Sequence, residues 1–159
     1  MKISAQEEYG LRCLVQLANL KDGESLTLPQ IAEREGISAA NAGKLMWLLN
    51  KAGFVQSTRG TKGGYLLARP AGEIRLSEII KVLDADLVDS HCDNYTGVME
   101  KCVHMGDCGI RPVIVGLHEI VENALSQITL AHLVGSERSV DLMFHSIQGI
   151  HRTIEPQRV

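Results

Sequence analysis

Three of the chain's four cysteines, Cys92, Cys102 and Cys108, lie close together in a segment rich in acidic residues. Thiolates bind soft metals such as zinc and iron, and they also hold iron–sulfur clusters. Structural zinc sites favour cysteine pairs about two to four residues apart, and neither interval here has that length. The wider spacing suits a cluster held by an irregular loop, while a redox disulfide such as Cys102–Cys108 is an alternative. From these residues alone we expect a metal or redox site.

The redox state of the compartment determines whether clustered cysteines form disulfides or stay as free thiols. The 159-residue chain begins with "MKISAQEEYG", which lacks the apolar core of a signal peptide, and it has no membrane-spanning apolar run. We therefore expect a cytoplasmic protein with no membrane partner, in which thiols stay reduced. Apolar residues make up 45% and charged residues 22%, which is typical of a globular protein.

Charge is distributed unevenly along the chain. Six basic residues and one acidic residue fall between positions 41 and 75, a local net charge of +5 in a chain whose formal net charge is −3. Clustered positive charge is typical of a nucleic-acid-binding face. A solvated basic surface explains the charge equally well, so other features must decide between the two.

The N-terminal part predicts a helix-turn-helix. Ser4 and Glu7 fit a capping box that begins a helix over 5–19. "LPQIAEREG" predicts a short second helix that ends at Gly36, and Ser38 can cap a third helix that ends near Gly53. Two short helices joined by a tight turn are typical of DNA-binding modules.

Alternating segments then predict a wing. "FVQSTR" and "YLLAR" resemble strands, and the glycine-rich "GTKGG" between them suits a hairpin turn. "IRLSEIIKVLDA" predicts a further helix before the cysteine segment. The expected fold is mainly α with a small β-hairpin wing, namely a winged helix-turn-helix followed by a long dimerisation helix.

That long helix begins near Pro112, which suits a first helical turn. Its apolar residues recur every three or four positions: Val113, Leu117, Val121, Ala124 and Ile128. One small winged domain offers too little surface to cover this stripe, so we expect dimerisation, with packing inside the chain as the alternative. The predicted division is a DNA-binding domain over 1–83, a cysteine-rich loop over 84–108, a dimerisation helix over 109–134 and a tail of unknown role over 135–159.

The residues expected to contact DNA come from the third helix and the wing. Recognition helices use their N-terminal residues, and asparagine and lysine can contact adenine, guanine or phosphate. Small glycines let a basic hairpin tip enter a minor groove, although they can also serve the turn alone. We expect Trp47 to be packing material, with a position near DNA as the alternative. The expected contacts are Ser38, Asn41, Lys44, Arg59, Gly60, Lys62, Gly63 and Gly64.

Taken in order, five motifs resemble one known family. "MKIS…EYGLR", "RGTKGGYLLARP", "IRLSEIIKVLD", the three-cysteine loop and "ITLAHLV" resemble the IscR/NsrR/RirA family of bacterial winged-helix repressors that carry iron–sulfur clusters. The resemblance spans residues 1 to about 134. It implies a homodimer that binds a double-stranded DNA operator, and a 2Fe–2S or 4Fe–4S cluster on Cys92, Cys102 and Cys108 that tunes this binding.

Three cysteines leave the cluster one ligand short. Where IscR-like members place a histidine, this chain has Arg111. The resemblance to NsrR-like members implies a carboxylate from the first helix of the other subunit, which makes Glu8 the first candidate and His104 the second. The alternative for Glu8 is an ion pair with Arg12, one helical turn away.

Two functions from different classes remain. The first is a transcriptional repressor that senses redox state, nitric oxide or iron and cluster supply. The second is an iron–sulfur or redox protein whose winged helix binds protein rather than DNA, which would have no use for the basic segment. No nucleophile–base pair or phosphate loop is visible, so we expect no enzyme. Cys13, among apolar neighbours, is expected to be a buried core residue.

Overall fold

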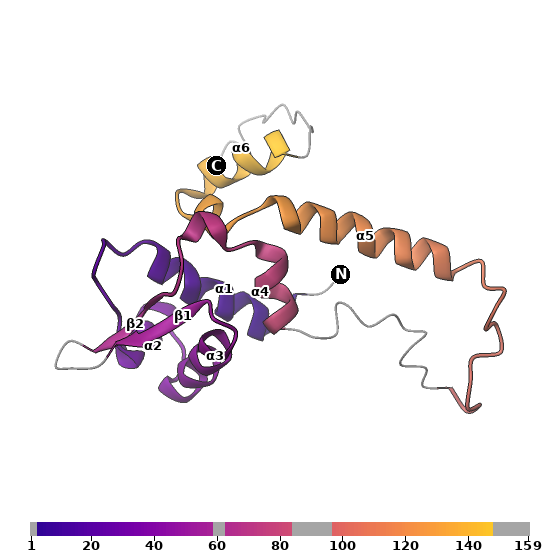
Figure 1. Cartoon of the computed structure of the whole chain (residues 1–159), viewed down its shortest axis with the longest axis horizontal. Helices are drawn as coiled ribbons and strands as arrows, with labels where there is room; N and C mark the ends of the chain where they lie inside the picture. The colour runs from indigo at the N-terminus through magenta and orange to yellow at the C-terminus, as the bar shows by residue number, and fades with distance from the viewer. Residues whose placement is uncertain (1–2, 59–62, 84–96, 148–159) are drawn as a thin grey trace, which may run out of the picture.

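The structure is a computed structural model that describes residues 3–58, 63–83 and 97–147 (Figure 1). Three helices come first: α1 (Ala5–Ala18), α2 (Leu28–Glu35) and α3 (Ala39–Lys51). The hairpin β1 (Val55–Thr58) and β2 (Gly64–Leu67), the short helix η1 (Ala71–Glu73) and α4 (Leu76–Leu83) follow. The chain continues with α5 (Arg111–Gln127), η3 (Leu130–Leu133) and α6 (Glu137–Ile147).

The predicted helix-turn-helix is confirmed, with the expected caps. Ser4 and Glu7 form a reciprocal capping box at α1, and the Ser38 hydroxyl accepts a hydrogen bond from the Asn41 amide at the start of α3. Gly36 ends α2 with φ of 63°, a left-handed conformation that glycine adopts without a steric penalty. These local signals explain why the helix boundaries follow so closely from the sequence.

One apolar core joins the first four helices, the hairpin and η3. It takes Leu14 and Leu17 from α1, Leu45 and Leu49 from α3, and Leu130 from η3. The inward positions of α3 recur at three- and four-residue intervals, as an amphipathic helix requires. This core fixes α3 and the base of the wing in one body. Within the described ranges, no helix has both the length and the apolar character that crossing a bilayer requires.

A third strand-like segment crosses the base of the wing. β1 and β2 pair in antiparallel register, with Val55 opposite Leu67 and Thr58 opposite Gly64. Leu26 pairs with Tyr65 on the other side of β2, through two backbone hydrogen bonds of 2.7 and 3.0 Å. A Cβ at Gly64 would stand 2.7 Å from the Leu26 carbonyl oxygen. Packing therefore explains the glycine at this position, because a side chain larger than hydrogen would collide with the Leu26 backbone.

Gly64→Ala is expected to lower the free energy of unfolding by about 1–3 kcal/mol, since the Leu26 backbone must move away and weaken its pairing. Urea denaturation of the purified variant measures the change. Gly72→Ala is the matched control, because a Cβ at Gly72 meets no atom within 4 Å. Equal unfolding midpoints for the two variants would contradict the explanation.

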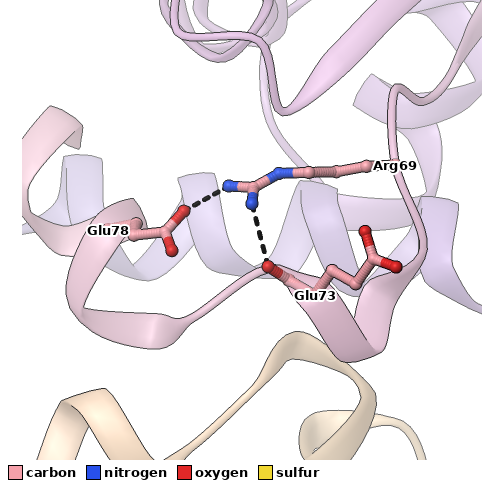
Figure 2. A network of polar contacts seen from close by, with 3 residues as sticks. All are labelled: Arg69, Glu73 and Glu78. Carbon is pink, nitrogen blue, oxygen red and sulfur yellow. Dashed lines mark hydrogen bonds and ion pairs between the residues drawn. The ribbon is translucent and has the colours of Figure 1, made fainter.

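Arg69 connects the wing to α4, as Figure 2 shows. Its guanidinium forms an ion pair with the Glu78 carboxylate and donates a 2.9 Å hydrogen bond to the Glu73 backbone carbonyl. The same group lies 5.6 Å from the centroid of the Phe54 ring, at the start of β1. One side chain thus ties the end of β2 to η1, to α4 and to the core.

The other end of α4 is held by α1. The Gln6 side-chain amide donates a hydrogen bond to the Leu83 backbone carbonyl. Gly10 lies directly against the Leu83 side chain, where a Cβ would come within 2.5 Å of a methyl group. α4 is therefore fixed at both ends to the body formed by α1, η1 and the base of the wing.

The long helix is shorter than predicted. α5 ends at Gln127, not near residue 134, and residues 128–130 run extended beside residues 74–76. The Leu76 amide donates to the Ile128 carbonyl and the Leu130 amide donates to the Ile74 carbonyl, both at 2.8 Å. This pairing uses backbone groups that a continued helix would need, and it buries Ile128 and Leu130 in the core.

The two halves of α5 have different surroundings. Near its C-terminal end, Lys81 of α4 forms an ion pair with Glu122, and Arg75 donates to the Ser126 carbonyl. The N-terminal half extends away from the N-terminal helices (Figure 1). The exposed apolar side chains of this half are Val113, Ile114, Val115, Leu117 and Ile120. The segment predicted as a tail contains helix α6, which lies beside η3.

Candidate DNA-binding face and cysteine loop

The outward side of α3 carries the predicted DNA contacts. Asn41 and Lys44 are exposed, whereas Ala42, Leu45 and Met46 are buried in the core. Ser38 is exposed, but its hydroxyl already accepts the 3.2 Å hydrogen bond from the Asn41 amide. The first turns of α3 thus present an amide and an ammonium group to solvent beside small alanines, Ala39 and Ala40. Such a face can approach the edges of base pairs closely.

Trp47 is exposed, so the prediction that it serves as packing material is wrong within this chain. The residue keeps 59% of its surface accessible. The ammonium group of Lys51 lies 5.2 Å from the centroid of its ring, a cation–π distance. Helical spacing could have shown this, because Trp47 is three residues from Lys44 and four from Lys51.

The wing is described only at its base. Gly63 and Gly64 are half-buried there. The Gly64 amide donates to the Thr58 hydroxyl at 3.1 Å, and that hydroxyl lies 3.3 Å from the Gly64 carbonyl oxygen. The predicted contacts Arg59, Gly60 and Lys62 lie outside the described residues. The base of the wing is thus pinned on both edges, by Thr58 and by Leu26, next to α3.

The described part of the cysteine loop holds two thiols. Cys102 and Cys108 are half-buried free thiols, and Cys92 lies outside the described residues. The Met105 amide donates to the Cys102 carbonyl at 3.0 Å, and the Asp107 amide donates to the His104 carbonyl at 3.2 Å. These two hydrogen bonds form two successive turns, over residues 102–105 and 104–107, which make this part of the loop locally compact. Residues 97–110 contain no helix or strand.

Over residues 97–110, the part that the structure describes, this loop has no apolar core of its own. The exposed apolar side chains around the two cysteines are Val98, Met99, Val103, Met105 and Ile110. Contacts with the rest of the chain do not bury them, and so burial does not fix the conformation of the loop. Within the described ranges, no three His, Cys, Asp or Glu side chains converge on one point.

Cys13 differs from Cys102 and Cys108 in its burial. It is completely buried in the core, which confirms the prediction for this residue. Burial, together with the nearby negative charge of Glu35, raises the pKa of its thiol to about 12. A thiol that stays protonated at neutral pH is a poor metal ligand and a poor nucleophile.

Glu8 forms the predicted ion pair within α1. Its carboxylate lies 2.5 Å from the Arg12 guanidinium, and the two side chains remain 50% and 52% exposed. Arg12 also lies 5.4 Å from the centroid of the Tyr9 ring. His104, the other candidate fourth ligand, is exposed in the loop, and Arg111 is the first residue of α5. The Glu8 carboxylate is therefore accessible from outside the chain.

Comparison with known proteins matches both halves of the chain. The family model described as Rrf2, iron-dependent transcriptional regulator, matches residues 3–136. The HTH-type transcriptional regulator IscR of Cronobacter sakazakii is 28% identical over 157 residues, which cover 99% of this chain and 94% of that protein. The match thus extends across the winged domain, the cysteine loop and α5.

Two solved structures share the fold. IscR of T. potens is 31% identical, with a TM-score of 0.65 over 82% of this chain and 84% of that one. CymR, the global cysteine regulator of B. subtilis, is 27% identical, with a TM-score of 0.67 over 85% of this chain and 99% of that one. The winged helix-turn-helix fold is confirmed by both.

Proposed function

The chain belongs to the Rrf2 family of transcriptional regulators, and from this premise we propose that it is a homodimeric repressor in the cytoplasm whose affinity for its operator depends on an iron–sulfur cluster. The observation that carries the proposal is the combination of an exposed polar face on α3 with free thiols in a loop next to α5. DNA-binding regulation follows from the family, and the cluster, the dimer and the sign of regulation are the proposed parts.

Operator recognition is assigned to α3 and the wing. In helix-turn-helix proteins the N-terminal residues of the second helix contact base edges in the major groove. Asn41 can pair with adenine, Lys44 can contact guanine or phosphate, and Ser38 orients the helix start through its cap. Arg59 and Lys62, with Gly60, Gly63 and Gly64, are the proposed wing contacts in the adjacent minor groove.

Dimerisation is assigned to the N-terminal half of α5. Five apolar side chains on this half are 40–66% exposed, and the described part of the chain packs nothing over them. Contiguous apolar patches of this kind usually mark protein–protein contacts. A second copy of α5, packed antiparallel or crossed, would cover both stripes at once, as an isologous interface requires.

The cluster is assigned to Cys92, Cys102 and Cys108. The two described thiols suit this role, because they are free and partly accessible, whereas the free thiol of Cys13 is buried. A loop without an apolar core can also adapt to a ligand that organises it from within. When bound, a cluster would supply a centre that reacts with oxidants or nitric oxide or responds to iron supply. The thiolates would hold it, and the loop would determine how α4 and α5 are linked.

Glu8 is the proposed fourth ligand, donated by the partner subunit. Glu8→Ala is expected to change the visible spectrum of the cluster and speed its loss in air, because a labile carboxylate ligand is removed. Arg12→Ala is the matched control, since it breaks the same ion pair but keeps the carboxylate. If the pair is the only role of Glu8, both variants lose about a few tenths of a kcal/mol of stability and neither spectrum changes.

Genome-wide binding in the source organism, for the wild type and for a Cys102→Ala variant, tests the function. We expect enriched pseudo-palindromic sites whose occupancy differs between the two proteins. The absence of an enriched site in either protein would contradict operator binding and favour a protein-binding module. Equal occupancy in both would leave a DNA-binding regulator that the cluster does not control.

A further inference from the structure

Trp47 stands between two lysines on the outward side of α3. Lys44, Trp47 and Lys51 are separated by three and four residues, which places them along one stripe of a helix. All three are exposed. α3 contains no acidic residue, so the charge along this stripe is purely positive.

The position of Trp47 is not explained by packing. Leu45, Met46 and Leu49 fill the inward positions of α3, each with at most 1% of its surface accessible. Trp47 points the other way, and it is the only tryptophan in the chain. A large aromatic ring that stays in water exposes considerable apolar surface, and here the ammonium group of Lys51 lies 5.2 Å from its centroid.

The C-terminal turn of α3 that carries this ring is held rigidly to the wing. The Asn50 side-chain amide donates to the Val55 carbonyl at 3.1 Å. The Phe54 amide donates to the Leu49 carbonyl at 3.0 Å and the Ala52 amide donates to the Leu48 carbonyl at 3.0 Å. Trp47 and Lys51 therefore keep a fixed position relative to β1, which leads to the tip of the wing.

We propose that Trp47 packs against the deoxyribose–phosphate backbone of duplex DNA, with Lys44 and Lys51 at neighbouring phosphates. This inference rests on the proposed operator binding and adds a contact to it. Trp47 lies about 13 Å along the helix axis from Ser38 at 1.5 Å per residue. That length is close to the ~12 Å width of the major groove. If the start of α3 is in the groove, Trp47 is at the groove's rim, where sugars and phosphates are the available surface.

The chemistry of the stripe matches that surface. Phosphates attract the two ammonium groups, and the apolar faces of the sugars can cover an indole ring that otherwise stays in water. Backbone contacts carry no base information. Trp47 is therefore expected to raise affinity for all duplexes alike, while Asn41 and the wing determine sequence preference.

Fluorescence tests this contact directly, because the chain has a single tryptophan and emission excited selectively from tryptophan, not from the three tyrosines, reports from position 47 alone. The probe is a DNA duplex of about 30 base pairs, which is about three helical turns. It is obtained by selecting, from a pool of randomised duplexes, a sequence that the full-length wild-type protein binds. We expect the emission to change on addition of the duplex and to recover with added salt. Trp47→Ala should weaken binding by about tenfold, measured by anisotropy of the labelled duplex, and Trp47→Phe should recover part of the loss.

Phe144→Ala is the control for removing an exposed aromatic ring, because Phe144 is 41% exposed on α6. Helix α6 is drawn at the top of Figure 1, and α3 is drawn near the bottom. It should bind as the wild type does. If Trp47→Ala binds with wild-type affinity and the wild-type emission is unchanged by a duplex that it binds, the contact is overturned and operator binding stands. If selection recovers no duplex with the wild type, operator binding itself fails, and this contact fails with it.

Discussion

Anaerobically purified protein with Cys102 or Cys108 replaced by alanine should contain almost no iron and show no visible chromophore. Each substitution removes one of the three proposed thiolate ligands, and the remaining groups cannot complete the coordination of a cluster. The two sites are half-buried in one loop and carry free thiols, so neither change disturbs the core. Iron and sulfide analysis with an absorption spectrum measures the loss, and circular dichroism should show unchanged helix content.

Cys13→Ala is the matched control for this experiment. The residue is buried in the core and its thiol has a pKa raised to about 12 by burial, so it is not expected to bind iron at neutral pH. The variant should keep the wild-type colour and iron content, with a small loss of stability from the missing sulfur atom. Colourless wild type after anaerobic reconstitution, or iron retained in both loop variants, would contradict the assignment.

Leu117→Glu is expected to convert the proposed dimer into a monomer and to weaken operator binding by about 100-fold or more. A charge in the middle of the α5 stripe cannot be buried against a second apolar helix without a large desolvation cost. A monomer also binds one half-site at a time and loses the gain in effective concentration that a dimer has on two half-sites. Sedimentation equilibrium gives the mass, and fluorescence anisotropy gives the affinity.

Leu142→Glu on α6 provides the comparison for this second prediction. Leu142 is 54% exposed and Leu117 is 56% exposed, so the same charge enters equally accessible leucines on two different helices. Only the α5 change should alter the mass. Two dimeric variants would remove α5 from the interface, and two monomeric variants would extend the interface to α6.

The local signals in the sequence predicted the winged domain well. Ser4 with Glu7, the Gly36 turn and the Ser38 cap each determine a helix boundary through contacts a few residues apart. The residues that make these contacts are neighbours in the sequence, and for this reason α1, α2 and α3 have the expected bounds to within about two residues. The purely local character of these caps explains the agreement.

Two features depend on segments that are far apart in the sequence. The end of α5 at Gln127 depends on residues 128–130 pairing with residues 74–76, which no local pattern shows. The hairpin sequence likewise does not show that the closest neighbour of Gly64 is the Leu26 backbone. The prediction for Trp47 is wrong for a different reason, because it rests on residue type although helical position already places the residue opposite Leu45 and Leu49. The cluster ligands and wing contacts stay predictions.

Helix α5 is attached to the rest of the chain near its C-terminal end, so a rotation at its N-terminal end would displace the winged domain. Lys81 and Arg75 fasten that end to α4, and α4 is fixed to the wing by Arg69 and to α1 by Gln6. The 17-residue helix is about 25 Å long at 1.5 Å per residue. A rotation of about 10° at its free tip would shift the attached body by about 4 Å, close to the ~3.4 Å rise of one base pair. In the proposed dimer, a change of about 10° between the two α5 helices would therefore shift the spacing of the two α3 helices by about the rise of one base pair, without any change inside either winged domain.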